Sequence, residues 1–171
     1  HFYLFSQLVD SPDQVLVVAH YVRIFLEHRN YDVHRAAADA LILSSSTSET
    51  QFLLIQQLLT MSIEWLQMKK TKLTLNALCI IRCCCKVHIH EVIHLFVDNK
   101  DLFLRHLQSD EHQVQNYAYK ITRDVLFSSK TSRTFIELVG KKIFEMFNRQ
   151  VDVTVIGPCR VLQFLCEHFF L

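Results

Sequence analysis

The sequence predicts an all-α fold, and three observations support this prediction. Only 2 of the 171 residues are Gly and 2 are Pro, although half of the chain is apolar and a fifth is charged. A β-rich fold needs turn residues roughly every 8–12 positions, and a phosphate-binding α/β fold needs a Gly-rich loop, so this composition disfavours both. Helix-start signals recur along the chain. Between them, apolar residues recur at three- and four-residue steps, which is the spacing of one helix face.

The start signals place the helices in order. Residues 11–14 read Ser-Pro-Asp-Gln, with a capping Ser, Pro at the first helical position and Gln three residues after the Ser. Residues 48–51 form a second capping box. Residues 109–111 read Ser-Asp-Glu, a cap followed by acids where the helix dipole favours them. The polar stretch at residues 44–49 is the clearest loop. We expect helices at residues 2–9, 12–28, 32–44, 49–68, 71–86, 89–97, 100–107, 110–127, 132–147 and 153–169.

One helix template recurs at intervals of about 40 residues, the spacing typical of helical repeats. It consists of an apolar residue, a small residue four positions later, and an apolar residue three positions after that. A shift of 41 relates Ala77, Ala118 and Cys159, and a shift of 40 relates Ala37 to Ala77. The four copies of the template are Val33-Ala37-Ala40, Leu73-Ala77-Ile80, Val114-Ala118-Ile121 and Val155-Cys159-Leu162.

The template has a physical reason in close helix packing. A small residue lets two helix axes approach, and its apolar neighbours fill the grooves on either side. A unit of about 40 residues cannot bury its own apolar face, whereas stacked units bury it continuously. The repeat therefore favours a right-handed α-solenoid of about four units, with residues 1–171 as a single domain. The alternative is an irregular helical bundle whose amphipathic helices coincide at one offset.

Two stretches resemble armadillo repeats. Residues 102–129 read LFLRHLQSDEHQVQNYAYKITRDVLFSS, and residues 4–28 read LFSQLVDSPDQVLVVAHYVRIFLEH. In the armadillo family a short helix ends in Leu-Leu, a Ser-Asp or Ser-Pro turn follows, and a long helix carries a V-x-x-x-A-x-x-x-L pattern. The Gly that usually separates the first two armadillo helices is missing here, which brings the units closer to HEAT-type helix pairs. The resemblance implies a solenoid whose long helices line a concave groove.

Basic residues mark a candidate partner-binding strip. Arg82 and Arg123 occupy equivalent repeat positions, five residues after the small residue. Asn116, Lys120 and Arg160 lie on or near the same strip if the units stack. Guanidinium groups in such a ladder suit carboxylate or phosphate groups, because each can form two parallel hydrogen bonds. The alternative is an ordinary solvated helix face.

Residues 90–94 read His-Glu-Val-Ile-His, the H-E-x-x-H pattern of zinc peptidases. Two His at i and i+4 lie on one helix face, and the Glu between them could act as a base. A catalytic site needs a third protein ligand, and the following residues lack the Gly and His of the metzincin extension. The chain also offers no candidate strands for the sheet that shapes a peptidase cleft. We therefore expect no catalytic activity.

Three consecutive cysteines precede this pattern. With Ala77 at the centre of the buried helix face, Cys84 falls near that centre, and Cys79 and Cys83 fall on the far side with Lys72 and Lys86. Neighbouring cations could lower the pKa of those two thiols, and a nearby His would allow a structural zinc site. Burial as small apolar side chains explains most cysteines without such chemistry. We expect no cofactor and no metal, and the residues to check are His90, His94, Cys79 and Cys83.

The net charge and the composition of the chain limit the kinds of partner that we expect. The net charge is +1, which gives nucleic acid no global attraction. No apolar stretch reaches the roughly 18 residues of a membrane span, so no membrane contact is expected. Most cysteines lie in apolar segments that are predicted to be helical, which suits reduced thiols in the nucleus or cytoplasm. Both ends look cut, which predicts a piece of a longer intracellular protein.

We interpret the chain as a non-catalytic scaffold for protein–protein interaction. It would dock a peptide segment or a helical domain of another protein on its groove or on an end surface. The aromatic residues Phe144, Phe147, Phe169 and Phe170 crowd the C-terminal units and could anchor a homo- or heterodimer there. Two other interpretations stay open: a zinc metallopeptidase-like enzyme, and a nucleic-acid-binding helical-repeat protein.

Overall fold

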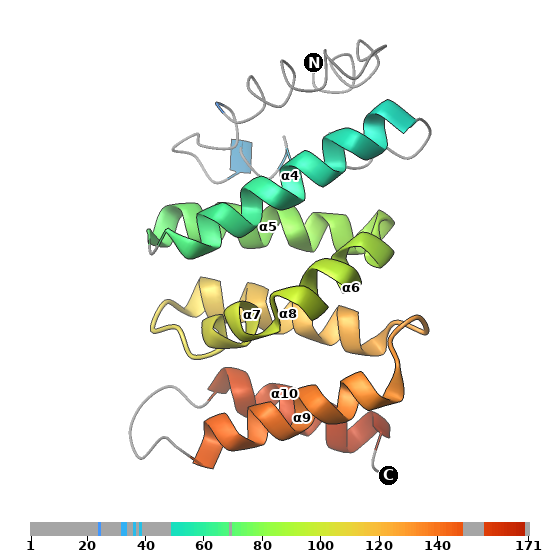
Figure 1. Ribbon diagram of the computed structural model, residues 1–171. Helices are drawn as coiled ribbons and strands as arrows, with labels where there is room; N and C mark the ends of the chain where they lie inside the picture. Colours follow the sequence, from blue (N-terminus) through green and yellow to red (C-terminus); the bar gives the residue numbers. More distant parts are fainter. Residues whose placement is uncertain are drawn as a thin grey trace. The chain divides into compact units, whose positions relative to one another are not determined.

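The computed structural model describes residues 49–68, 70–148 and 156–169, together with Ile24, Asp32, Val33, Ala36 and Ala38. The helices of these ranges follow one another along the chain, and the ranges contain no strand (Figure 1). The predicted all-α fold class is therefore confirmed for this part of the chain. Apart from the five single positions, the helices expected at 2–9, 12–28 and 32–44 lie outside the described residues, as does most of the loop expected at 44–49.

The helices begin and end within a few residues of the predicted bounds. The helix α8 begins at His112, two residues later than expected. The reason is that the hydroxyl of Ser109 accepts a hydrogen bond from the backbone N–H of Glu111 at 3.2 Å, which makes a turn before the helix and not a helix cap. The helices are α4 (Glu49–Gln67), α5 (Thr71–Val87), α6 (Ile89–Asp98), α7 (Lys100–His106), α8 (His112–Phe127), α9 (Arg133–Asn148) and α10 (Ile156–Phe169).

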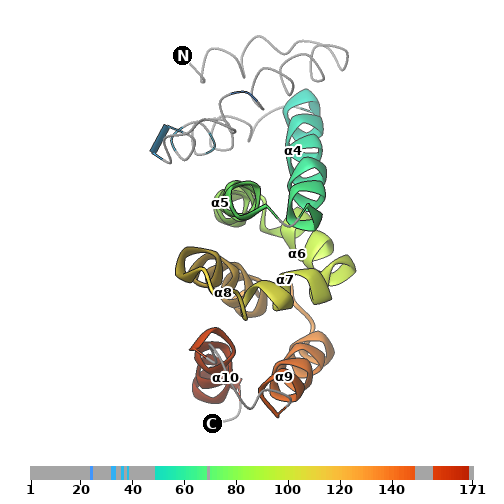
Figure 2. The ribbon, with the colours of Figure 1, turned by 90° about the vertical axis from the view of Figure 1, so that its left-hand side faces the viewer.

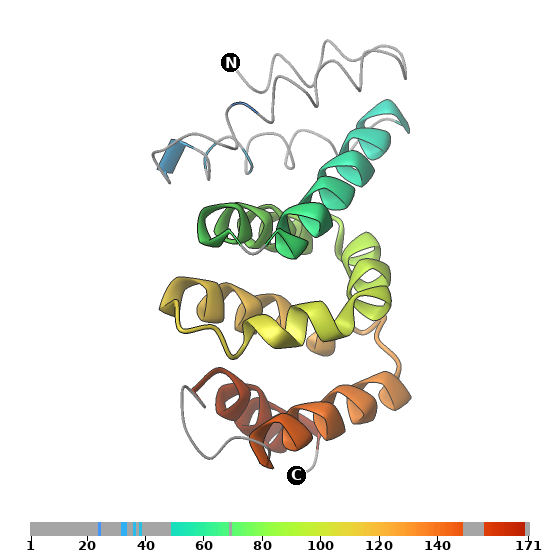
Figure 3. The ribbon, with the colours of Figure 1, turned by 60° about the vertical axis from the view of Figure 1, so that its left-hand side comes forward.

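The chain divides into two compact units, residues 1–88 and residues 89–171. In the first unit α4 packs beside α5 (Figures 1 and 3). Trp65 of α4 is fully buried, as are Ala77 and Ile80 of α5. The Ala77 template position is thus buried as predicted. The prediction that residues 1–171 form a single domain stays a prediction.

Helix α5 is buried around most of its circumference. Its residues Asn76–Ile81 and Cys83–Cys85 are all buried, so consecutive side chains point inward on every side of the helix. Cys79 and Cys83, expected on the side of α5 away from Ala77, are therefore buried on that side too. The repeat template marks a single face of α5, whereas the buried residues occupy several faces of this helix.

In the second unit α8 packs against α6, α7 and α10, and α9 packs against α10. Figure 2 shows α8 and α10 along one side of this unit and α6 and α9 along the other. Phe96 and Phe103 stack with ring centroids 4.8 Å apart, and Phe135 meets Phe96 edge-on at 6.2 Å. Such pairs add roughly 0.5–1.5 kcal/mol to the free energy gained by burying the rings.

The template is buried in α8 but not in α10. Val114, Ala118 and Ile121 are buried in α8 as predicted. In α10, Cys159 and Cys166 are exposed, so the predicted alignment at a shift of 41 is wrong there. The buried positions are instead Gly157, Pro158, Val161, Phe164 and Leu165. They correspond to the buried residues of α8 at a shift of 43, which relates Ala118 to Val161.

The close approach at Gly157 explains this change of register. A side chain at Gly157 would collide with the backbone carbonyl of Leu107, and its Cβ would lie 2.8 Å from Cγ of Gln115. The first turn of α10 can therefore meet the chain after α7 only through a residue without a side chain. The expected packing residue Cys159 is two positions further along and turns to the surface.

Candidate functional site

Two of the predicted site residues meet between α8 and α10. Arg160 Nη1 donates a hydrogen bond to Asn116 Oδ1 at 3.4 Å, across 44 residues of sequence. The guanidinium carbon of Arg160 also lies 4.1 Å from the centre of the Tyr119 ring. Asn116 and Tyr119 are three residues apart on α8 and therefore share one face of the helix. The three side chains form one group, which we call the Arg160 group.

The start of α10 positions this arginine. The helix begins at Ile156, and Pro158 lies in its first turn, where no backbone N–H is needed for an intrahelical hydrogen bond. Gly157 brings that turn against the chain next to α8. Arg160 then emerges one turn later, beside the middle of α8, with its side chain half-buried.

The partners of Arg160 leave its positive charge uncompensated. An amide oxygen and an aromatic ring are both neutral, so they orient the guanidinium plane without cancelling its charge. Within the described residues, no carboxylate forms an ion pair with Arg160. A guanidinium held flat in this way keeps donor groups for a carboxylate or phosphate.

Lys120 lies one turn beyond Asn116 on the same face of α8. Its Nζ is 6.0 Å from the centre of the Tyr117 ring, at the outer limit of a cation–π contact. Burial raises the pKa of the Tyr117 hydroxyl above its ordinary value of 10.0, so the ring stays neutral beside the ammonium group. Lys120 therefore adds a second positive charge to the face that carries Asn116.

Arg123 is placed differently from Arg160. Its guanidinium forms an ion pair with the adjacent Asp124, with Nη2–Oδ1 at 3.0 Å and Nε–Oδ1 at 3.2 Å. Asp124 is the more buried of the two side chains, and it compensates much of the charge that the predicted ladder needs. Neighbouring residues in a helix do not normally face each other, so this pair could not be predicted from sequence spacing.

Arg82 belongs to the first unit, where it lies half-buried on α5 and already takes part in an interaction. The equivalence of Arg82 and Arg123 stays a prediction. The structure thus brings Asn116 and Arg160 together, places Lys120 and Arg123 on the same helix as Asn116, and adds Tyr119, which sequence reasoning missed. A tyrosine three residues from Asn116 would have been visible in the sequence as a possible stacking partner.

The residues considered for metal binding fall into two separate pairs. Cys79 and Cys83 are buried in the first unit, and His90 and His94 are exposed on α6 in the second. The described residues contain no group of three or more His, Cys, Asp or Glu side chains that could hold a metal ion. Two imidazoles alone make an incomplete zinc site, since structural and catalytic sites use at least three protein ligands.

The aromatic residues expected at the C-terminal end are only partly buried. Phe144 on α9 is 55% exposed, and Phe169 lies half-buried near Phe164 with ring centroids 6.3 Å apart. The side chain of Phe147 and all of Phe170 lie outside the described residues. A further cluster was not foreseen: Phe127, 64% exposed, meets both Phe164 and His168, with centroid distances of 6.1 and 5.8 Å.

Comparison with protein-family models and with curated proteins gave no significant match. In the part of the chain that the structure describes, no helix combines the length and the apolar character that a membrane span requires.

Proposed function

We propose that the chain is a non-catalytic protein-interaction module that binds an acidic segment of a partner at the Arg160 group. The observation that carries the proposal is the placement of Arg160, oriented by Tyr119 and Asn116 and uncompensated by any carboxylate of the described residues. A preorganised guanidinium loses less conformational entropy on binding, so it contributes more affinity than a mobile surface arginine. Lys120 would add attraction from the same helix face.

The proposed architecture is a right-handed armadillo/HEAT-like solenoid of about four units. Its support is the sequence of elements around α8. The short α7 is followed by the Ser109 turn and by the long α8, with Val114, Ala118 and Ile121 buried, as the armadillo resemblance implies. The buried shift of 43 residues between α8 and α10 is also compatible with units of this size.

Binding, and not catalysis, is the activity that these residues support. His90 and His94 stand exposed on α6, and no third ligand joins them in the described residues. The Arg160 group holds a cation, an amide and a phenol ring, which suit the binding of an anion. We therefore propose a scaffold role in an intracellular protein, with another protein as the ligand.

A matched pair of charge reversals tests the proposal. Arg160→Glu and Lys130→Glu change the net charge equally, but Lys130 is an exposed residue between α8 and α9 and is not part of the Arg160 group. A fluorescein-labelled peptide of Glu and Gly serves as the probe, because it has charge and no apolar anchor. We expect Arg160→Glu to weaken binding about tenfold or more in fluorescence polarisation, and Lys130→Glu to change it by less than about twofold.

The same experiment separates the competing interpretations. Equal binding by wild type and Arg160→Glu, with unchanged helical content, would remove the Arg160 group from the proposal. Tighter binding to a DNA or RNA duplex, with an affinity that falls steeply with salt, would favour the nucleic-acid interpretation. Peptide hydrolysis that zinc restores to the metal-depleted protein would favour the peptidase.

A further inference from the structure

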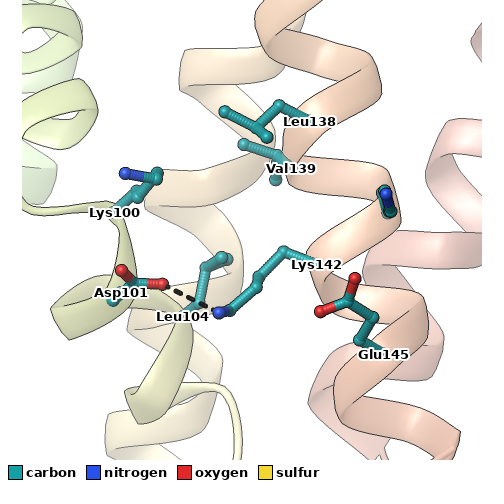
Figure 4. Close-up of a pocket in the computed structure, with 8 residues that line it drawn as sticks. Lys100, Asp101, Leu104, Leu138, Val139, Lys142 and Glu145 are labelled. Carbon is teal, nitrogen blue, oxygen red and sulfur yellow. Dashed lines mark ion pairs between the residues drawn. The ribbon is translucent and has the colours of Figure 1, made fainter.

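A pocket of about 230 Å³ lies between α7 and α9 in the second unit (Figure 4). Leu104 of α7 and Val139 of α9 are almost fully buried and form its apolar floor. Leu138 lies beside them and is 49% exposed, so its apolar surface remains open to water. The pocket shares no residue with the Arg160 group on α8 and α10.

Charged side chains form the rim of the pocket. Lys142 reaches from α9 to Asp101 on α7, with Nζ 3.4 Å from Oδ1, and this ion pair spans the rim. Lys100, Lys141 and Glu145 complete it. Among the described residues, neither Lys100 nor Lys141 has a carboxylate partner. The rim therefore carries three ammonium groups and two carboxylates, and its net charge of +1 favours a negatively charged ligand.

The size of the pocket indicates what kind of ligand it fits. Small-molecule sites occupy roughly 300–1,000 Å³ and enclose most of the ligand. This pocket is smaller and partly open to solvent, so it suits a single side chain of a larger partner. Interface anchors have this form: one bulky apolar side chain enters a pocket, and charges around the rim orient the segment that carries it.

We propose that the pocket between α7 and α9 is a second docking site, which receives a leucine-sized apolar side chain of an acidic protein segment. The side chain covers Leu104, Val139 and Leu138, and carboxylates of the segment lie at Lys100 and Lys141. The ion pair of Lys142 with Asp101 crosses the rim from α9 to α7. This site differs from the Arg160 group because it requires an apolar anchor in addition to negative charge.

The probe is a fluorescein-labelled peptide in which one leucine is flanked by glutamates, measured by fluorescence polarisation on the whole chain. We expect Leu138→Asp to weaken binding about tenfold, because it puts a carboxylate beside the anchor. We expect Lys141→Glu to weaken it about threefold, with a larger effect at low salt. Leu138 and Lys141 are both exposed, so these changes leave the helical content unaltered, which circular dichroism checks.

Matched variants control for general effects. Phe144→Asp also removes an exposed apolar side chain of α9, and Lys130→Glu also reverses one exposed charge, but neither residue lines the pocket. Both should bind the leucine peptide as the wild type does. The Arg160→Glu variant should still bind the leucine peptide, and its binding should still depend on the leucine. This expectation holds whether or not the proposed function of the Arg160 group passes its own test.

Five results would overturn the proposal. The first is unchanged binding by Leu138→Asp, and the second is an equal loss in Phe144→Asp. The third is equal binding of a peptide with serine in place of leucine, which would mean that the site recognises only the negative charge of the peptide. The fourth is self-association of the chain that Leu138→Asp abolishes in sedimentation equilibrium, since a second copy then fills the pocket. Competition by N-acetyl-leucine as strong as that of the peptide would likewise assign the pocket to small carboxylates.

Discussion

The backbone of Gly157 lies against the carbonyl oxygen of Leu107, so closely that no side chain fits at position 157. This contact joins the first turn of α10 to the chain that follows α7, and it sets which face of α10 turns inward. Arg160, Val161 and Leu165 take their positions from it. The register of α10, and with it the geometry of the Arg160 group, thus depends on the absence of a Cβ at one residue.

Gly157→Ala should destabilise the protein by about 1–3 kcal/mol, because the new methyl group overlaps a backbone carbonyl that cannot rotate away. The control is Gly140→Ala in α9, where the added Cβ would lie 3.3 Å from Cδ1 of Leu165, the end of a flexible side chain. That change should be neutral or stabilise by up to about 1 kcal/mol, since Ala favours the helix. Urea unfolding followed by circular dichroism measures both, and equal effects would contradict the account.

Phe96→Ala should cost about 3–5 kcal/mol of unfolding free energy, because Phe96 is fully buried and stacked on Phe103. Phe144→Ala removes the same side chain from a position that is 55% exposed, and should change stability by less than about 0.5 kcal/mol. Chemical denaturation of the two variants gives the comparison. A small loss for Phe96→Ala would mean that the packing of α6 on α7 contributes little.

Only two of the six thiols should react quickly in the native protein. Cys159 and Cys166 are exposed on α10, whereas Cys79, Cys83, Cys84 and Cys85 are buried. Titration with a chromophoric disulfide reagent should therefore show two fast thiols, with the other four reacting only as the protein unfolds in denaturant. Fast reaction of four or more thiols without denaturant would contradict the burial of α5.

Stability should fall as the pH rises above about 10, and Tyr117 should cause part of the fall. Burial raises the pKa of its hydroxyl in the folded state, so the unfolded chain loses this proton at a lower pH than the folded chain. The contribution is complete below the unfolded pKa of 10.0 and is lost as the pH rises through the folded pKa. Tyr117→Phe should have a shallower fall of unfolding free energy across this range, and absorbance of the phenolate follows the titration directly.

Local signals were enough to predict the helices between residues 49 and 169 that the structure describes, since apolar spacing and scarce Gly and Pro act within one element. The burial of Ala77 and Ala118 followed from the same spacing. The register of α10 could not be predicted, because it depends on the approach of Gly157 to Leu107, which are far apart in sequence. The burial of Cys79 and Cys83 could not be predicted, because the apolar spacing indicates one buried face, whereas α5 is buried on several.

The candidate site was predicted in part. The repeat argument put Asn116 and Arg160 on or near one strip, and the structure joins them by a hydrogen bond. The repeat argument did not predict the ion pair of Arg123 with Asp124 or the stacking of Tyr119 on Arg160. Both contacts depend on side-chain conformations, which spacing does not determine. The pocket between α7 and α9 was also not foreseen, since it needs two helices at a defined separation.

Helix α5, with side chains enclosed on nearly every side, limits how this chain can evolve. A polar replacement there would leave an unsatisfied group, a larger one would strain the neighbours, and a smaller one would open a void. Only exchanges of similar volume, such as Ile for Leu or Cys for Ala, remain inexpensive. Among homologues of this chain, amino-acid substitutions should therefore accumulate far more slowly at residues 76–85 than on the exposed side of α9.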